Sequence, residues 1–205
     1  MRRARYLSLA LLVALSSACS ILPKPENAQV YRLPASTSAS SVAPVSWSLR
    51  INKPLASDVF NLPRIAVVPE GNQVSTYRGA RWTDPAPVLL RNRMLDAFQR
   101  DGRVPRLSAD DSNLQADYEL VGELQAFQSE YTADGISVVI RLDARLVEGR
   151  SQRILASRHF EVRQPQADKA VPAVVSGLGQ VTDRLMAQLL DWTVAQGNQY
   201  QPKNQ

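Results

Sequence analysis

Residues 117–164, DYELVGELQAFQSEYTADGISVVIRLDARLVEGRSQRILASRHFEVRQ, decide the fold of this 205-residue chain. The stretch holds three long segments in which apolar and polar residues alternate, separated by short turn sequences at 133–135 and 149–151. Because turns this short return a chain antiparallel to itself, we expect a three-stranded meander. Its apolar faces, which need a cover, carry Ile136, Val138, Ile140, Leu142, Ala144 and Leu146 on one strand and Ile154, Ala156, Phe160 and Val162 on the next.

A long C-terminal helix is the expected cover. It is predicted from about Pro172 to Gln196 and, at about 1.5 Å per residue, is long enough to cross the whole sheet. Asp183 and Gln188 fall outside its apolar stripe and are expected to tolerate alanine. The stripe itself is formed by Val174, Val175, Leu178, Val181, Leu185, Leu189 and Trp192.

A second, shorter helix is predicted after Asp84, which we expect as its N-cap, with Pro85 at the first helical position and Gly102 as its end. Its apolar stripe is Leu90, Met94, Ala97 and Phe98. Shorter strands are predicted within 46–51, 64–68 and 74–82, the last with Gly79 as a turn or bulge. The predicted fold is α+β, an antiparallel or mixed β-sheet with two helices packed on it.

The first 18 residues have the organisation of an export signal. Arginines precede an apolar run at 7–15, and small residues follow it. The run is shorter than the about 20 residues that a spanning helix needs. Cys19 follows immediately, as in a bacterial lipobox, although Ser16 stands where such motifs usually have leucine.

Cys19 is the only cysteine, and the chain has one histidine. Neither a disulfide nor a zinc site can be built from that inventory within the chain. Cys19 is therefore predicted to carry acyl chains such as palmitate, which would anchor the protein to a membrane. The residue after the cysteine is Ser20 and not aspartate. This pattern resembles the sorting signal of outer-membrane lipoproteins in Gram-negative bacteria.

Four regions follow from this interpretation: a signal peptide at 1–18, a lipidated N-terminus with a flexible tether at 19–44, a domain at 45–197 and a polar tail at 198–205. The tether is rich in Ser, Ala and Pro. Its segment 30–34 is more apolar than a linker requires, so we expect it to dock, either on its own domain or on a neighbouring subunit.

The composition argues against nucleic-acid binding. The formal net charge is +5, but three of the arginines belong to the signal, which leaves +2 for the mature chain. No cofactor or metal site is predicted. Gly177 and Gly179 lie inside the long predicted helix, where they would allow close approach to the sheet.

Catalytic candidates are equally weak. His159 alternates with polar residues on a strand and has no evident nucleophile beside it. The neighbouring acids Asp110 with Asp111, and Asp117 with Glu119, are expected to be solvated, because no histidine cluster or calcium-loop spacing accompanies them.

The order of short motifs resembles the ABC-type transport auxiliary lipoprotein family, which includes the PqiC-like proteins. The motifs are YRLP at 31–34, RIAVV at 64–68, GARWTDP at 79–85, ADYELVGELQAFQ at 116–128, RLDARLVEG at 141–149, ILASRHFEV at 154–162 and LLDWTVAQ at 189–196. The resemblance implies a fold like the N-terminal domain of TolB and a role that is not enzymatic. It also implies a ring-forming lipoprotein at the outer-membrane end of an intermembrane lipid transport system, whose partners are a periplasmic MCE-domain protein and its ABC permease and ATPase.

Four residues are predicted to contribute to contacts between subunits or with that partner: Tyr31, Leu33, Arg81 and Trp82. Tyrosine, tryptophan and arginine are enriched in interface hot spots. The alternative left open is that Trp82 packs in the core and Tyr31 packs on its own sheet.

Two other function classes fit the same anchor. One is an outer-membrane lipoprotein that clasps a β-barrel or polymer precursor during assembly, and the other is a periplasmic hydrolase. A neighbouring MCE gene would favour transport over assembly, whereas a hydrolase needs a nucleophile with a base.

Replacing the acylation site tests the anchor. Cys19→Ala is expected to abolish incorporation of radiolabelled palmitate and to leave an unprocessed or soluble protein, whereas Ser17→Ala, two residues away, should still be labelled. Labelling that persists in the Cys19→Ala variant would contradict the prediction.

Overall fold

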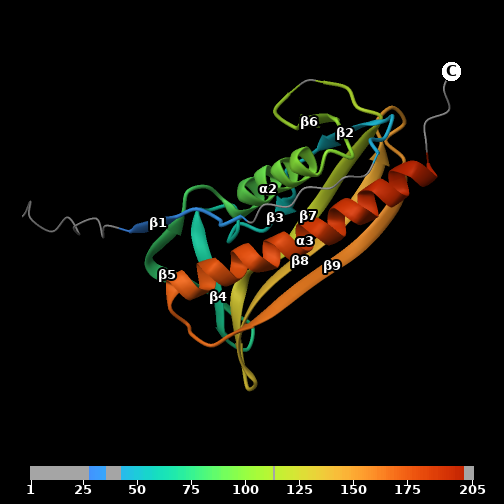
Figure 1. Cartoon of the computed structure of the whole chain (residues 1–205). Coiled ribbons are helices and arrows are strands. Elements are labelled where there is room, and N and C mark those ends of the chain that lie inside the picture. Colours follow the sequence, from blue (N-terminus) through green and yellow to red (C-terminus); the bar gives the residue numbers. More distant parts are fainter. Residues whose placement is uncertain (1–27, 36–42, 113, 201–205) are drawn as a thin grey trace, which may run out of the picture.

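The structure, a computed structural model, describes residues 28–35, 43–112 and 114–200. Cys19, the predicted signal and most of the predicted tether lie outside the described residues. In the described part, one mixed β-sheet carries two helices on one face (Figure 1), which confirms the α+β prediction. The strands are β1 (Gln29–Tyr31), β2 (Ser48–Ile51), β3 (Leu55–Ala56), β4 (Arg64–Glu70), β5 (Gln73–Trp82), β6 (Arg106–Ala109), β7 (Tyr118–Thr132), β8 (Gly135–Glu148) and β9 (Ile154–Gln166), and the helices are α2 (Ala86–Asp101) and α3 (Val171–Gln199).

Strand β7 is the centre of the sheet. On one side β8 pairs antiparallel with it from end to end, and β9 pairs antiparallel with β8, which confirms the predicted meander. On the other side β2, β3 and β4 follow one another along β7, each parallel to it. β6 extends the sheet outward from β2, whereas β5 and then β1 extend it from β4. We call β4, β5 and β1 together the β1 wing.

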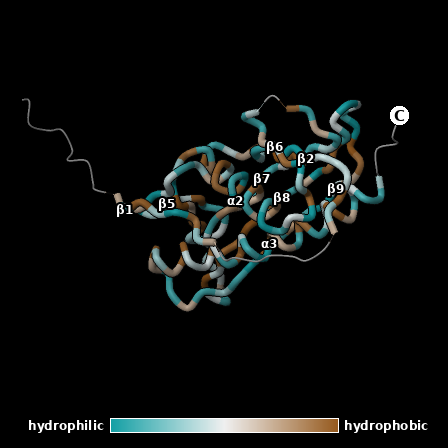
Figure 2. Tube along the Cα trace, turned by 45° about the horizontal axis from the view of Figure 1, so that its top comes forward, coloured by the Kyte–Doolittle hydropathy of each residue, from teal (hydrophilic) through white to brown (hydrophobic). Residues whose placement is uncertain are grey.

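The core lies between this sheet and the two helices. All seven residues of the predicted α3 stripe are buried, as are Leu90, Met94 and Phe98 of α2. Edge-to-face aromatic pairs join the layers: Phe160 of β9 packs on Trp192 of α3 with ring centroids 5.7 Å apart. Hydrophobic stretches of the chain run mostly through the interior, and the outer turns are hydrophilic (Figure 2).

The ends of α2 confirm one prediction and correct another. Gly102 ends the helix in the left-handed conformation, with φ of 76°, and its N–H donates to the Phe98 carbonyl. Pro85 rather than Asp84 occupies the N-cap position, and no side chain caps the helix. Asp84 is one residue too early for that role, because the extended backbone of Pro85 delays the first helical residue to Ala86.

Two α3 glycines allow close packing. A Cβ at Gly177 would lie 2.4 Å from the Gln166 amide nitrogen on β9, and one at Gly179 would lie 2.9 Å from the Pro34 ring. Approach to the sheet is therefore confirmed for Gly177, whereas Gly179 accommodates the N-terminal segment. None of the helices in the described part of the chain is long and apolar enough to cross a membrane.

The phase of α3 can be tested by substitution. Leu185→Ala and Leu189→Ala should each lower the free energy of unfolding by about 2–5 kcal/mol, because both side chains are fully buried and would leave cavities. The exposed Gln188 is the matched control, and Gln188→Ala should change the free energy of unfolding by less than about 0.5 kcal/mol. Equal losses in urea titrations of all three variants would show that the buried face is wrongly placed.

Candidate functional site

The N-terminal segment is part of the folded domain. β1 pairs parallel with β5, with Gln29 opposite Ala80 and Tyr31 opposite Trp82. The Thr83 N–H also donates to the Tyr31 carbonyl at 2.9 Å. Of the two docking sites left open by the sequence, the structure therefore places this segment on its own domain.

The residues after β1 pack against α3. Leu33 is buried in the core, 8% exposed, and the Pro34 ring sits over Gly179. Any larger side chain at position 179 would collide with that ring. The segment from β1 to Pro34 is thus held by β5 on one side and by α3 on the other. The predicted tether is shorter by this segment, because the segment belongs to the folded domain.

The four predicted interface residues separate into two groups. Trp82 is fully buried, and its ring packs edge-to-face on Phe127 at 5.8 Å, while Leu33 lies in the same core. Neither has surface to offer a partner, so the direct contact expected of them is corrected to core packing. The cause is strand alternation, which turns Trp82 toward the helices and Arg81 away from them. Tyr31, half-buried, and Arg81, exposed, stay available.

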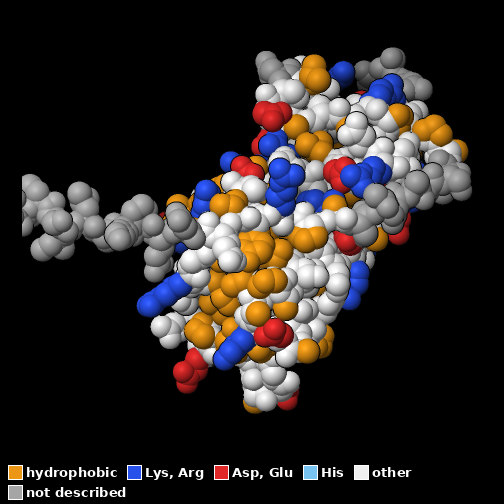
Figure 3. All heavy atoms as spheres, turned by 60° about the vertical axis from the view of Figure 1, so that its left-hand side comes forward, with side chains coloured by type: hydrophobic (Ala, Val, Ile, Leu, Met, Phe, Trp, Pro, Cys, Tyr) orange, Lys and Arg blue, Asp and Glu red, His pale blue; other side chains and the backbone are white. Residues whose placement is uncertain are grey.

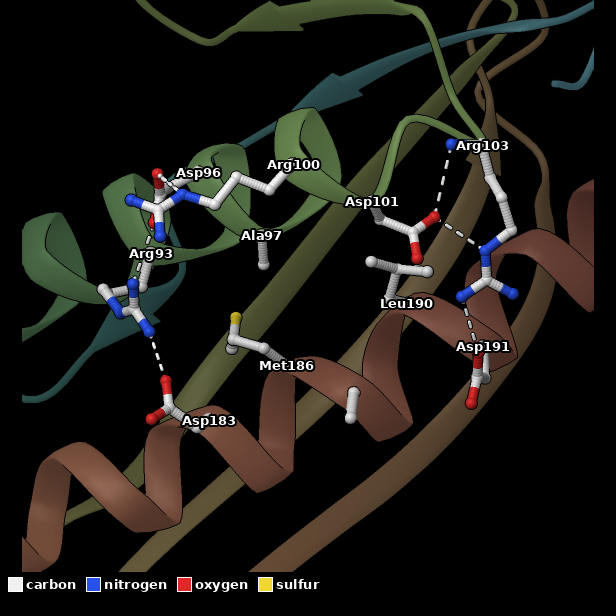
Figure 4. Close-up of a pocket in the computed structure, with 11 residues that line it drawn as sticks. Arg93, Asp96, Ala97, Arg100, Asp101, Arg103, Asp183, Met186, Leu190 and Asp191 are labelled. Carbon is white, nitrogen blue, oxygen red and sulfur yellow. Dashed lines mark hydrogen bonds and ion pairs between the residues drawn. The ribbon is translucent and has the colours of Figure 1, made fainter. Parts of the chain in front are cut away.

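A groove separates α2 from α3 and has a volume of about 170 Å³ (Figure 4). Its apolar floor is formed by Ala97 of α2 and by Met186 and Leu190 of α3. Its rim consists of the charged residues Arg93, Asp96, Arg100, Asp101, Arg103, Asp183 and Asp191.

These rim charges join the two helices. Arg93 donates hydrogen bonds to Asp96 on its own helix and to Asp183 on α3. Arg103 likewise bridges Asp101 and Asp191. This pairing argues against the expectation that Asp183 tolerates alanine, because the Arg93 side chain that it pairs with is only 11% exposed. Removing the carboxylate would weaken the pairing of a largely buried cation.

The sheet face opposite the helices carries an ionic network centred on Glu130. Arg141 and Arg163 donate to its two carboxylate oxygens at 2.9 and 2.6 Å, and Gln128 donates at 3.0 Å. Burial alone would raise the pKa of Glu130, but these hydrogen bonds outweigh it and hold the pKa below the ordinary value of 4.5.

His159 lies on the same sheet face and is more than half exposed. Its Nδ1 is 2.7 Å from an Asp143 oxygen, and no hydroxyl is recorded as bonded to it in the described residues. The described chain also contains no group of three or more His, Cys, Asp or Glu side chains that could hold a metal ion.

The acid pairs expected to be solvated have structural partners instead. Asp110 accepts from Arg91, and Asp117 accepts from the Ser48 backbone N–H and hydroxyl, both at 2.7 Å. Glu119 accepts from Asn52 at 2.9 Å. The Asp117 and Glu119 bonds fasten β2 and the residue after it to the start of β7, and the Asp110 bond fastens the segment after β6 to α2.

Comparison with known proteins places this architecture in a family. The family model described as ABC-type transport auxiliary lipoprotein component matches residues 31–189. The chain belongs to this family, whose members are auxiliary lipoproteins of ABC transport systems.

Two solved structures and one curated protein are similar to it. A protein from Xanthomonas campestris, described as a DUF330 member, superposes with a TM-score of 0.77 and 29% identity, covering 83% of this chain and 98% of that one. An uncharacterised protein superposes with a TM-score of 0.63 over 82% of this chain and 99% of that one, and at 18% identity it shows the fold alone. An uncharacterised protein of Bradyrhizobium diazoefficiens is 31% identical over 153 residues, 73% of this chain but 40% of its own length. The chain thus spans less than half of that relative.

The Glu130 network predicts a pH dependence. A carboxyl whose pKa is lowered by folding stabilises the folded state above its unfolded pKa, and that stabilisation is lost as the pH falls below it. Glu130→Gln should therefore cost about 1–3 kcal/mol at pH 7, and the gap from the wild type should shrink as the pH falls from 5 to 3.

Urea titrations at pH 7, 5 and 3 measure this gap. Glu161→Gln is the matched control, because Glu161 pairs with Arg141 but is 40% exposed, and it should show a smaller gap. Wild type and Glu130→Gln that lose stability in parallel over the whole range would contradict the assigned role.

Proposed function

We propose that this protein is a non-catalytic outer-membrane lipoprotein that docks on or caps the periplasmic MCE-domain subunit of an ABC-type intermembrane lipid transport system. The anchor is Cys19, the domain faces the periplasm, and several copies assemble into a ring. Family membership carries the proposal, because auxiliary lipoproteins of ABC systems are what the matched family contains.

The docked N-terminal segment supports this arrangement. The family match begins at Tyr31, so it includes the end of β1 and the contact of Pro34 with Gly179 of α3. A lipid anchor only ten residues before β1 would therefore act on a rigid part of the fold rather than on a long free linker. Such an attachment fixes which end of the domain lies nearest the membrane.

Tyr31, which is half-buried, is the candidate for contacts within the ring or with the MCE subunit. It lies on the helix-facing side of the sheet edge, beside Trp82, and its hydroxyl donates to Gln29 at 2.5 Å. An edge strand of three residues leaves backbone groups unpaired on its outer side, which suits pairing with another chain.

Copurification tests the proposal. The full chain, extracted from membranes with detergent, should retain an MCE-domain protein encoded beside its gene and should have a multimeric mass by light scattering. Tyr31→Ala should reduce both while leaving the thermal melt within a few degrees, and Tyr200→Ala, which changes a tyrosine at the far end of α3, should reduce neither. A strictly monomeric wild type that retains no MCE-domain protein would overturn the proposal.

A further inference from the structure

A row of arginines crosses the outer side of the β1 wing. Arg64 of β4 lies directly opposite Arg81 of β5, and Arg81 lies opposite Val30 of β1. Trp82, the next residue along β5, is buried under the helices. Because side chains alternate along a strand, the row of Arg64, Arg81 and Val30 lies on the face away from the helices.

The pairing of Arg64 with Arg81 breaks a general rule of sheets. Side chains directly opposite each other are about 4.5–5.5 Å apart at Cβ, and like charges there are destabilising. In the described part of the chain neither arginine has an ion pair, although both are exposed. Elsewhere on the same sheet face, Arg141 and Arg163 share the carboxylate of Glu130. No acid offsets this charge at the row, because Glu70, the one acid of the β1 wing, lies at the other end of β4.

Arg32 adds a third charge to this row. It follows Val30 by two residues just beyond β1, and it is exposed without an ion pair in the described residues. Val30, which lies between Arg81 and Arg32, is half exposed. In Figure 3, which is turned so that the left-hand side of Figure 1 comes forward, Lys, Arg, Asp and Glu side chains border a hydrophobic area. An exposed apolar residue flanked by unpaired arginines suits the interface of a phospholipid layer, where phosphates meet acyl chains.

Chain length brings this row to a membrane. Nine residues, 20–28, separate Cys19 from β1. Even fully extended, nine residues span only about 30 Å. Neighbouring strands are about 4.8 Å apart, so Arg64 on β4 lies only about 10 Å beyond β1. A bilayer that holds the anchor is therefore within reach of all three arginines.

We propose that Arg32, Arg64 and Arg81 form a headgroup-binding row that seats the β1 wing on the phosphates of anionic lipids in the anchoring membrane. The guanidinium groups take the phosphate oxygens as bidentate acceptors, which offsets the repulsion between Arg64 and Arg81. The proposal rests on the lipid attachment at Cys19. Tyr31, on the other side of the sheet, stays free for protein contacts.

Arginine footprinting tests this seating. The lipidated full chain is reconstituted into phosphatidylcholine vesicles with or without 30% phosphatidylglycerol, treated with phenylglyoxal, and its modified arginines are quantified by mass spectrometry. A basic residue near an anionic surface gains about 1 kcal/mol, so modification of the three arginines should slow by about fivefold on the anionic vesicles. The protection should vanish at 1 M salt, where the Debye length is about 3 Å.

The internal controls are Arg145 and Arg150, which are exposed and have no ion pair in the described residues. Arg145 lies near the C-terminal end of β8 and Arg150 in the turn after it, away from the β1 wing, so both should react equally on both kinds of vesicle. Replacing Arg64 and Arg81 with glutamine should remove the protection of Arg32, whereas the Arg145→Gln, Arg150→Gln variant should keep it. Because the readout is the modification of individual arginines, it does not require the substitutions to change the stability of the protein.

The possible failures are distinguishable. If the protein floats with neither kind of vesicle, the lipid anchor is ruled out, and the headgroup-binding row that depends on it is ruled out as well. Protein that floats with both while its three arginines react equally would remove the headgroup row and leave the anchor intact. Protection on neutral vesicles produced by 10 mM inorganic phosphate would show a site for a free anion and would also overturn the proposal.

Discussion

The fold depends on the length of one strand. β7 has 15 residues, enough to pair with β8 along one edge and with β2, β3 and β4 in turn along the other. The register with β8 shifts between Leu124 and Ala126, which lies between the positions that pair with β3 and with β4. A bulge there increases the local twist between the part of β7 that pairs with β3 and the part that pairs with β4.

This arrangement explains why the N-terminal segment matters to the whole domain. In the described part of the chain the β1 wing pairs with β7 through β4, near the hairpin end of β7, and α3 crosses over to reach the same end. β1 and Pro34 connect these two parts, because β1 pairs with β5 while Pro34 packs on Gly179 of α3. A force on the anchor would therefore be shared between the sheet and the long helix.

Local patterns predicted much of the fold, and long-range pairings were beyond them. Alternation and turn chemistry gave the meander, and helical spacing gave the buried stripe of α3, because both depend on neighbouring residues. The parallel pairing of β2 and β4 with β7 joins residues far apart in sequence, and no local signal carries it. β6 was missed because only two of its four residues are apolar and none of the four is fully buried.

The candidate site shows the same limit. Tyr31 and Trp82 stood out as large aromatics, but whether each faces the core depends on the β1 and β5 pairing, which the sequence does not reveal. Asp183 looked like a solvated residue on a polar helix face until Arg93 of α2 was placed beside it. The arginine row has no local sequence signal, because it depends on the register that sets Arg64 against Arg81.

The central claim is that β1, which follows the proposed lipid anchor, is a stable strand of the sheet. Hydrogen exchange of the β1 backbone amides tests this claim most directly. We predict that those backbone amides of residues 29–31 that point toward β5 exchange as slowly in the full chain as the amides of β5, and that Gly179→Val, which displaces Pro34, accelerates β1 while β7 and β8 keep their protection. Exchange at β1 as fast as in an unstructured peptide in the wild type would contradict the account.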